Sequence, residues 1–448
     1  MALEVHLLAC LLGMGSWVAI NGMWVELPLI VPDVPEGWHL PSYLTLLIQF
    51  ANLGPLFVML LHQFQPARLN ETAIIYTIIS IGVLACLLLA FFWRETTIVG
   101  GAPHSTALLV LIFFLSMVDC TSSVTFLPFM MRLKTHYLST YFIGEGLSGL
   151  IPGFVALAQG VGVVHCVNGS LPSTHLLDTN ITISSHLQAV YQPARFPVKV
   201  FFLFLSGMMV ICLTAFVLLN NLPSARREQD KVRAQPGIQK EGRKSKLSKR
   251  KMAEQKPMIN DQEQIQSSFG TGTFSWSQII YIFLLLAWAN ALTNGVLPAV
   301  QSYSCLPYGN SAYHLSATLA ALANPLACLI TMVLPNRSLM TLGILTTVGT
   351  GIGSYIMTMA VLSPCPLLLH THIGVILIVL CWVLFVGLLS YVKVMIGLIL
   401  RGEGHHALVW CGATVQLGSM VGALTMFPLV SVYHLFQSGD PCNTSCSL

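Results

Sequence analysis

The sequence predicts an all-α polytopic membrane protein that crosses the bilayer through 11 helices. Of its 448 residues, 55% are hydrophobic and only 8% are charged, whereas soluble proteins carry roughly 25% charged residues. The mean hydropathy is +0.74. Apolar runs long enough to cross a bilayer recur along almost the whole chain. This composition excludes a soluble globular protein.

The loops between the expected spans carry their positive charge unevenly. If the N-terminus is inside, 12 of the 21 Lys and Arg residues fall in one cytoplasmic segment, 221–256. The outer side then carries only Arg94 and Arg195, with Lys199 at the start of the sixth span. Cytoplasmic loops are enriched in Lys and Arg, so an inside N-terminus is expected, and 11 spans place the C-terminus outside. The expected spans are 5–31, 42–64, 73–93, 106–131, 137–164, 197–220, 277–298, 313–334, 338–361, 373–400 and 407–435.

These spans predict two halves joined by a charged linker. Residues 1–220 form a six-helix N-terminal half, and residues 277–448 form a five-helix C-terminal half with an extracellular tail. Residues 221–276 are expected to be a disordered basic cytoplasmic linker, which could touch anionic membrane lipid. Binding to nucleic acid is disfavoured, because this basic run lies between membrane spans.

Glycosylation sequons provide an independent test of this topology. The sequons at Asn168, Asn180 and Asn443 fall outside the cell, where they can be glycosylated. Those at Asn70 and Asn336 fall inside and should stay unmodified.

Five of the 12 cysteines fall on the expected outer side, where disulfides persist: Cys166, Cys305, Cys365, Cys442 and Cys446. An odd number leaves at least one of them free. We expect a disulfide between Cys365 and Cys442, which would tie the loop after the ninth span to the tail. Connectivity does not follow from sequence alone, so other pairings stay open. No metal-binding spacing such as CxxC is present.

The first span is unusually polar for a membrane helix. Lipid tails offer no hydrogen bonds, so Asn21 and Glu26 should face protein or a water-filled cavity. Pro28 lacks a backbone donor and should loosen the helix near its outer end. A polar, aromatic-rich first span suggests a translocation path.

An internal repeat accompanies this span. Asn21-Gly22 followed by Leu27-Pro28 recurs as Asn294-Gly295 followed by Leu297-Pro298, and Asn52 recurs as Asn324. The offsets are 294 − 21 = 273 and 324 − 52 = 272. Spans one to five therefore resemble spans seven to eleven, although such motifs are also common in unrelated membrane helices. Repeats with a site between them are a transporter architecture.

Few charged side chains lie inside the spans. The acidic ones are Glu26, Asp119 and Glu145, and the basic one well inside a span is Lys393. Buried charge in lipid is usually paired or functional. Glu145 and Lys393 are plausible partners near the cytoplasmic side, either as a structural salt bridge or as a substrate contact or gate.

Amides and aromatic rings are the remaining candidates for ligand contacts. Asn side chains on the repeat-matched spans have donors and an acceptor, which suit a neutral polar ligand. Hydrogen bonding between helices is the alternative role. Aromatic rings could stack on a flat ligand or simply pack. Neither a nucleophile–base order nor a nucleotide-binding loop with its strand–helix context is present, so we expect no enzyme and no cofactor.

Long segments resemble the vertebrate riboflavin transporter family, solute carrier family 52, nearest its third, epithelial paralogue. They include GMGSWVAINGMWVELPLIVPDVPEGWHLPSYL, TSSVTFLPFM, GEGLSGLIP, NALTNG, YSCLPYG, LSYVKVM and CGATVQLGS. The resemblance covers nearly the whole chain except 166–195 and 221–270. It implies a plasma-membrane carrier that takes up riboflavin independently of sodium and is favoured by mild acid. It also implies an arrangement like that of equilibrative nucleoside transporters, related to the major facilitator class.

We therefore expect riboflavin uptake by alternating access, with no obligate protein partner. The residues expected to approach the ligand are Asn21, Trp24, Asn52, Asn290, Asn294 and Asn324, and those of a cytoplasmic-side polar cluster are Glu145, Tyr391 and Lys393. Candidates for the acid response are Glu26, Glu36 and His39. The alternatives are a carrier for nucleosides or another flat polar metabolite, and a receptor that binds without transport.

Overall fold

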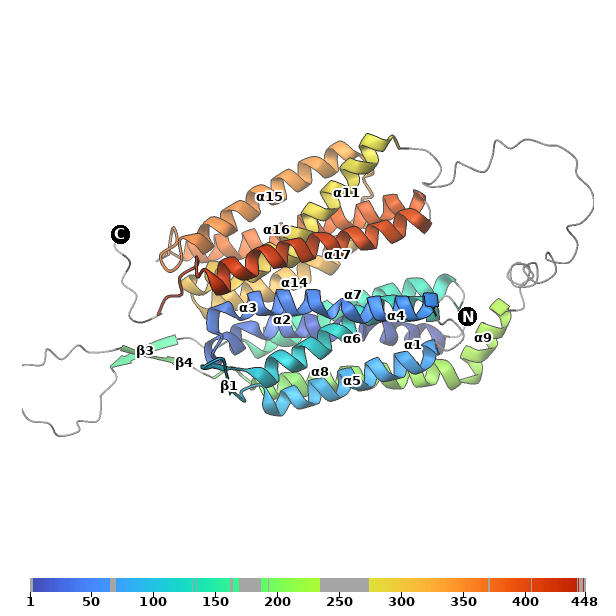
Figure 1. Cartoon of the computed structure of the whole chain (residues 1–448), viewed down its shortest axis with the longest axis horizontal. Helices are drawn as coiled ribbons and strands as arrows, with labels where there is room; N and C mark the ends of the chain where they lie inside the picture. The colour runs from blue at the N-terminus through green and yellow to red at the C-terminus, as the bar shows by residue number, and fades with distance from the viewer. Residues whose placement is uncertain are drawn as a thin grey trace, which may run out of the picture.

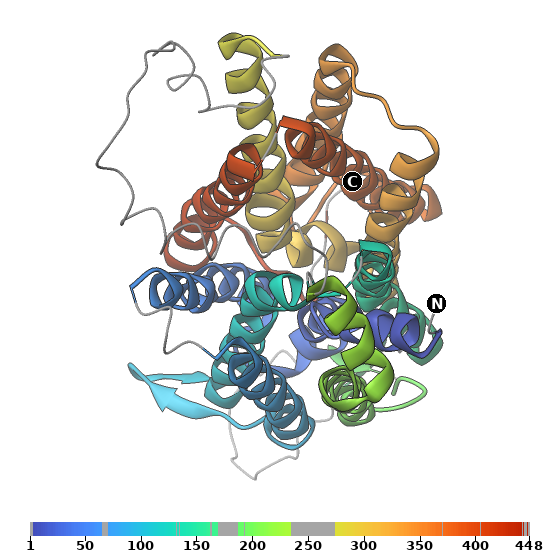
Figure 2. The ribbon, with the colours of Figure 1, turned by 90° about the vertical axis from the view of Figure 1, so that its right-hand side faces the viewer.

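Two bundles of helices lie against each other along their length in the computed structural model (Figure 1). Figure 2, which views the molecule end-on, separates the bundle of the N-terminal half from that of the C-terminal half. The structure describes residues 3–64, 70–130, 132–133, 135–161, 164–168, 187–191, 193–233, 274–369, 371–403, 405–440, 442 and 446.

The first bundle holds the N-terminal half of the chain. Its helices are α1 (Leu3–Met14), α2 (Val18–Ile30), α3 (Leu40–Ala51), α4 (Leu53–Phe64), α5 (Glu71–Phe92), α6 (Thr106–Met130), α7 (Thr135–Gln159) and α8 (Val198–Asn221). Two short 3-10 turns, η1 (Val31–Asp33) and η2 (Gly37–His39), connect α2 to α3.

The second bundle holds the C-terminal half. Its α-helices are α11 (Trp276–Ala291), α12 (Leu297–Ala299), α13 (Gln301–Cys305), α14 (Asn310–Val333), α15 (Leu339–Val361), α16 (His372–Glu403) and α17 (His405–Phe427). Two π-helical segments, η4 (Leu292–Val296) and η6 (Pro428–Val432), and the 3-10 turn η5 (Leu306–Tyr308) complete it.

The helices are long and apolar enough for a multi-pass membrane protein. Within the described residues, ten helices could each cross a membrane, and the bent pair α1 and α2 makes up to eleven. Side chains cap three of the helix starts, because a helix leaves its first N–H groups without partners. Asn70 accepts from Ala73 N at 3.3 Å, Ser338 accepts from Thr341 N at 3.5 Å, and Ser275 forms a capping box with Gln278.

Two expected spans of the N-terminal half are not single continuous helices. The first was expected as one helix loosened near Pro28, but it breaks earlier: α1 and α2 meet at a 49° bend after Met14. Pro28 lies in the last full turn of α2, where the helix is already ending. The second span is divided at Asn52 into α3 and α4.

Short elements mark the two ends of the molecule. The hairpins β1–β2 (Thr97–Val99 with Ala102–His104) and β3–β4 (Val164–Asn168 with Leu187–Tyr191) lie at the same end as η6. Helix α9 (Pro223–Arg233) and the start of α1 lie at the opposite end (Figure 1). We call these the hairpin end and the α9 end. The expected basic linker therefore begins as a helix, and residues 234–273 lie outside the described part of the chain.

Glycine allows helix backbones to touch in both bundles. A Cβ atom added at Gly144 of α7 would lie 1.9 Å from the carbonyl oxygen of Cys10 in α1. A Cβ atom at Gly418 of α17 would lie 2.3 Å from the carbonyl oxygen of Ala287 in α11. Small residues permit this close packing in membranes, where lipid is as apolar as the side chains it replaces. These contacts fix α1 on α7 and α11 on α17.

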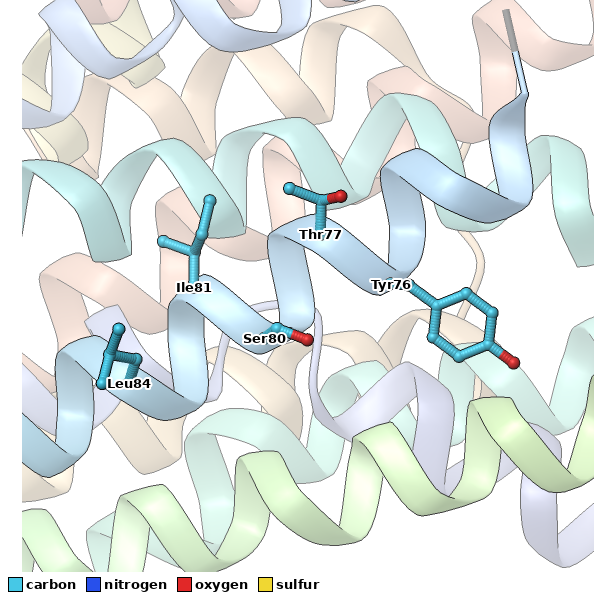
Figure 3. Close-up of a pocket in the computed structure, with 5 residues that line it drawn as sticks. All are labelled: Tyr76, Thr77, Ser80, Ile81 and Leu84. Atoms are coloured by element: carbon cyan, nitrogen blue, oxygen red, sulfur yellow. The ribbon is translucent and has the colours of Figure 1, made fainter.

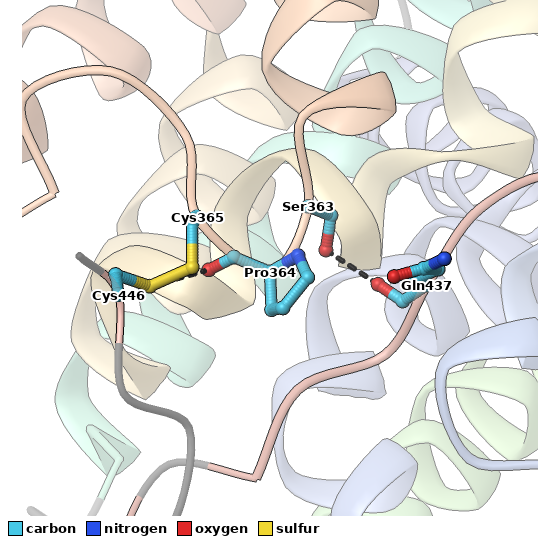
Figure 4. The surroundings of a disulfide bond; sticks show 5 residues. All are labelled: Ser363, Pro364, Cys365, Gln437 and Cys446. Atoms are coloured by element: carbon cyan, nitrogen blue, oxygen red, sulfur yellow. Dashed lines mark hydrogen bonds between the residues drawn. A yellow bond between two sulfur atoms is a disulfide. The ribbon is translucent and has the colours of Figure 1, made fainter.

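The disulfide pairing differs from the expected one. Cys365 pairs with Cys446, and Cys166 pairs with Cys442, so the expectation of a Cys365–Cys442 bond is wrong. Figure 4 shows the first of these bonds beside the hydrogen bond from Ser363 Oγ to the carbonyl of Gln437, at 2.7 Å. Cys305, the fifth cysteine, is free and buried. The two bonds tie the β3–β4 hairpin and the loop after α15 to one tail.

Of the sequons expected to be glycosylated, Asn180 and Asn443 lie outside the described residues. Asn168 is the last residue of β3.

Proteolysis of the unreduced protein should yield one peptide pair linking Cys166 to Cys442 and another linking Cys365 to Cys446. Within the part of the chain that the structure describes, these are the cysteine pairs at bonding distance. Mass spectrometry before and after reduction measures the pairing, and a proteolytic cut between Cys442 and Cys446 is needed to separate the two. A peptide that links Cys365 to Cys442 would contradict the structure.

Candidate functional site

The interruption of the first span exposes backbone groups that a continuous helix would satisfy. In an α-helix the N–H of residue 20 donates to the carbonyl of residue 16. Here Ile20 N donates instead to Asp119 Oδ2 of α6, at 2.9 Å, and Ser122 Oγ donates to the carbonyl of Ser16, also at 2.9 Å. Two side chains one turn apart on α6 therefore replace the missing bond. The next backbone bond, from Asn21 N to Trp17 O, begins the regular helix α2.

Asn21 follows this break directly and reaches the fifth expected span. Its Nδ2 donates to Ser148 Oγ of α7 at 3.2 Å, and Ser148 Oγ donates to the carbonyl of Glu145 at 2.6 Å. Trp24 lies one turn further along α2 and is half-buried against the core. A Cβ atom at Gly149 would lie 3.5 Å from Asn21 Nδ2 and 3.9 Å from the carbonyl of Ala321 in α14. Asn21 therefore lies where α2, α7 and the opposite half meet.

The seventh expected span is also irregular, and it carries a similar set of polar groups. Its π-helical segment η4 contains Thr293 and Asn294. Asn294 Nδ2 contacts Asn290 Oδ1 at 3.2 Å and Ser419 Oγ of α17 at 3.0 Å. Lys393 Nζ of α16 donates to Thr293 Oγ1 at 3.0 Å, and Thr293 in turn donates to the carbonyl of Ala289. Short π-helical segments are frequent at functional sites.

The other two expected amides lie on the second and eighth spans. Asn52 Nδ2 donates to Gln416 Oε1 of α17 at 3.0 Å, which is a hydrogen bond between the two halves. Asn324 precedes Pro325 in α14, and its side chain is exposed. Gln416 is exposed as well. These amides are accessible along the faces where the halves approach each other.

The structure does not form the expected cluster of Glu145, Tyr391 and Lys393. Among the described residues, no carboxylate lies within 4 Å of Lys393 Nζ, so the suggested Glu145–Lys393 ion pair is absent. Tyr391 lies two residues before Lys393, and side chains two residues apart point to different faces of a helix. Its hydroxyl donates to the carbonyl of Leu334 at 2.7 Å. Lys393 and Tyr391 therefore contact different neighbours.

The candidates for an acid response all lie toward the hairpin end. Glu26 is fully buried, and its Oε1 accepts from Gln159 Nε2 of α7 at 2.9 Å. Glu36 Oε1 accepts from Ser105 N at 2.8 Å, at the start of α6, and lies 3.3 Å from His104 Nδ1.

His39 belongs to a contact between the two halves at the same end. Its Nδ1 lies 2.9 Å from the hydroxyl of Tyr303, and its ring lies 5.3 Å from that of His434. Ser42 Oγ contacts Ser431 Oγ at 2.7 Å, and Ser302 Oγ donates to the carbonyl of Trp38. Polar and aromatic contacts therefore join the halves at the hairpin end.

The apolar core joins the two halves at the hairpin end more than at the α9 end. One continuous core joins buried residues of both halves and includes Leu27, Leu40, Tyr303 and Phe436. A separate cluster lies toward the α9 end of the C-terminal half and takes its buried members from α11, α15, α16 and α17. Among the described residues, three hydrogen bonds join side chains of the two halves. The bond between Asn52 and Gln416 is the nearest of the three to the α9 end, and the bonds of Ser42 and His39 lie at the hairpin end.

The surface hollow in Figure 3 does not contribute to this arrangement. It is lined by one face of α5, through Tyr76, Thr77, Ser80, Ile81 and Leu84. A groove formed by a single helix lacks the convergent polar groups of a ligand site. We therefore place the candidate site between the halves, at the first and seventh expected spans, which are interrupted by the bend after Met14 and by the π-helical segment η4. We call these two the interrupted spans.

The sequence singled out Asn21, Asn290 and Asn294 as candidates but not the side chains that the structure places against Asn21 and Asn294. Ser148 and Ser419 gave no signal by themselves, because serine is common in membrane helices. Thr293 escaped notice for the same reason. Asp119 was visible as a charge within a span, but its bond to a backbone N–H depends on the break in the first span, which the sequence did not predict.

Comparison with known proteins shows the family of the chain. The family model described as "Solute carrier family 52, riboflavin transporter" matches residues 1–438. Riboflavin transporter 2 of Salmo salar is 63% identical over 457 residues, and member 3-B of this family from Danio rerio is 61% identical over 453 residues. Both alignments cover 100% of each chain.

Solved structures show the fold. The D-xylose–proton symporter has a TM-score of 0.55 at 12% identity, with 97% of this chain and 93% of that chain covered. At this identity the likeness concerns the fold alone. The family match and the full-length relatives together identify the chain as a member of solute carrier family 52, the riboflavin transporters, which is a family of transporters and not of enzymes.

Proposed function

We propose that this protein carries riboflavin across the plasma membrane by alternating access, independently of sodium. The observation that carries the proposal is the pair of interrupted spans, each with an Asn side chain held between helices, in a chain of the riboflavin transporter family. Riboflavin presents a flat ring with imide edges and a polyhydroxylated tail. Amides can match such edges because they offer both donors and acceptors.

The two halves act as repeats in this proposal, and the hydrogen bonds of the two amides support it. Asn21 contacts Ser148, and Asn294 contacts Ser419. The two asparagines are separated by 294 − 21 = 273 positions, and the two serines are separated by 419 − 148 = 271 positions. The same Asn–Ser bond thus joins the first and fifth spans of one half and the corresponding spans of the other. Two such units facing each other would place a ligand between them.

The ligand contacts that we propose are the amides and one indole ring. Asn21 and Asn294 lie on the interrupted spans, Asn290 lies one turn from Asn294, and Asn52 and Asn324 lie on the next span of each half. Trp24 is half-buried one turn from Asn21, where its ring could stack on the flat ligand.

The state described corresponds to a carrier closed at the hairpin end. Contacts of His39 and Ser42 with the C-terminal half close that end, and the separate core cluster at the α9 end leaves the halves less firmly joined there. With the hairpin end outside, this is an inward-facing arrangement. Transport would then require the contacts at the hairpin end to break while the halves close at the α9 end.

The topology proposed with this function has 11 spans, an inside N-terminus and an outside C-terminus. It places the disulfides and the sequons at Asn168, Asn180 and Asn443 outside, where oxidation and glycosylation occur. The basic segment that starts with α9 then lies inside, where anionic lipid is available.

Purified protein in lipid vesicles should take up radiolabelled riboflavin with time, equally in sodium and in choline buffer. Excess unlabelled riboflavin should abolish this uptake, whereas excess uridine should not, and vesicles without protein serve as the control. Equal competition by uridine would instead identify a nucleoside carrier. Label that binds without entering the vesicle interior would identify a receptor.

Asn21→Ala and Asn294→Ala should each lower riboflavin uptake at least tenfold while surface expression persists. Loss of either half-buried amide would leave a polar edge of the bound ligand unpaired, which costs about 1–3 kcal/mol, or roughly a tenfold effect or more. The matched control is Asn221→Ala, since Asn221 is exposed at the end of α8 and donates to its own helix at Val217 O. Normal uptake by Asn21→Ala would remove Asn21 from the site.

A further inference from the structure

Asp119 is a fully buried acid that the proposed ligand contacts do not use. Its Oδ2 accepts from Ile20 N at 2.9 Å, and its Oδ1 has no hydrogen-bond partner within the described part of the chain. Ser122, one turn further along α6, donates to both the carbonyl of Asp119 and that of Ser16. The two residues thus bind both ends of one backbone bond, Ile20 N to Ser16 O, that the bend removes from the first span.

The missing bond from Ile20 N to Ser16 O lies immediately before Asn21, and within the described residues the N–H groups of Trp17, Val18 and Ala19 also make no backbone bond across the bend. A straight helix through residues 14–20 would restore these bonds, remove the 49° bend and turn the following residues about the helix axis. Asn21 would then no longer be aimed at Ser148. The side chains of α6 therefore determine where Asn21 points, although they lie away from it.

The other half carries a counterpart of opposite charge. Lys393 of α16 donates to Thr293, the residue before Asn294, just as Asp119 accepts from Ile20, the residue before Asn21. The offsets are 393 − 119 = 274 and 293 − 20 = 273. The charge of each residue fits the group that its span offers. The broken first helix leaves the N–H of Ile20 free, and a carboxylate can accept from it. The π-helical segment keeps its backbone bonds and offers the hydroxyl of Thr293, which can accept from the ammonium group of Lys393.

We propose that Asp119, with Ser122, and Lys393 are positioning residues for riboflavin binding, which hold the two interrupted spans so that Asn21 and Asn294 face the ligand. This inference rests on the proposed function. Asp119 acts on the ligand through Ile20 and Asn21, and Lys393 acts through Thr293, without touching the ligand. In this role Asp119 supplies a hydrogen-bond acceptor at a fixed position on α6. A neutral acceptor of the same shape should therefore preserve riboflavin binding.

The test compares Asp119→Asn with Asp119→Leu in riboflavin binding and uptake. Asn keeps an oxygen that can accept from Ile20 N, whereas Leu has a similar volume and no acceptor. Asp119→Asn should keep binding affinity and uptake within about twofold of the wild type. Asp119→Leu should weaken binding by roughly tenfold or more, because it leaves the buried N–H unpaired and frees Asn21. Ser116→Ala is the control: Ser116 is equally buried on α6 but donates only to its own helix, at Ile112 O.

A double-mutant cycle separates positioning from general stability. In an Asn21→Ala background, Asp119→Leu should cause little further loss of affinity, since the side chain that it positions is already gone. If Asp119→Leu fails to fold, Ser122→Ala decides, because it leaves the carbonyl of Ser16 without its donor and should raise KM several-fold more than Ser116→Ala.

Three results would overturn the inference. The first is wild-type riboflavin affinity in Asp119→Leu, or in Ser122→Ala if Asp119→Leu does not fold. The second is an equal loss of affinity in Asp119→Asn and Asp119→Leu, and the third is full additivity of Asp119→Leu with Asn21→Ala. Equal losses would show that the negative charge itself is needed. None of these results affects the proposed function, which fails separately if the wild-type protein does not transport riboflavin.

Discussion

A backbone hydrogen bond that the first span lacks is the constraint on which the candidate site depends. Nothing in a bilayer core can satisfy a free N–H or carbonyl, so a helix can break there only if other parts of the protein bind both groups. In this protein α6 does so through Asp119 and Ser122. The break places Asn21 against α7, close to the C-terminal half. Packing between α1 and α7, tight enough to require Gly144, keeps the two sides of the break together.

The same constraint explains why the site lies between the halves. The C-terminal half distorts its own first helix into a π-helical segment, and Asn294 is held by Ser419 as Asn21 is held by Ser148. Irregular helices are costly where lipid covers them and acceptable where protein or a water-filled cavity does. In the alternating-access carrier that we propose, the opposite half covers these segments, and the contacts at the hairpin end control which side opens.

Sequence patterns predict those parts of the fold and the candidate site that depend on neighbouring residues in the chain. Apolar runs indicated a multi-pass helical membrane protein and the approximate limits of most of its long helices, because burial in lipid acts on every residue in a run. The repeat directed attention to Asn21 and Asn294. A continuous first helix loosened near Pro28 was expected, whereas the helix breaks beside Gly13 and Gly15, which allow close approach to neighbouring helices. Partners distant in sequence, such as Cys446 for Cys365 and Thr293 for Lys393, require three-dimensional geometry, which no local pattern contains.

A structure of the protein with riboflavin bound, determined by electron cryomicroscopy in lipid nanodiscs, is the most direct test of this account. The account predicts density for the flat ring between the two interrupted spans, with ring edges within hydrogen-bond distance of Asn21 and Asn294 and with Asp119 still bonded to Ile20 N. Density for riboflavin elsewhere, or a continuous first helix in the ligand-bound state, would contradict it.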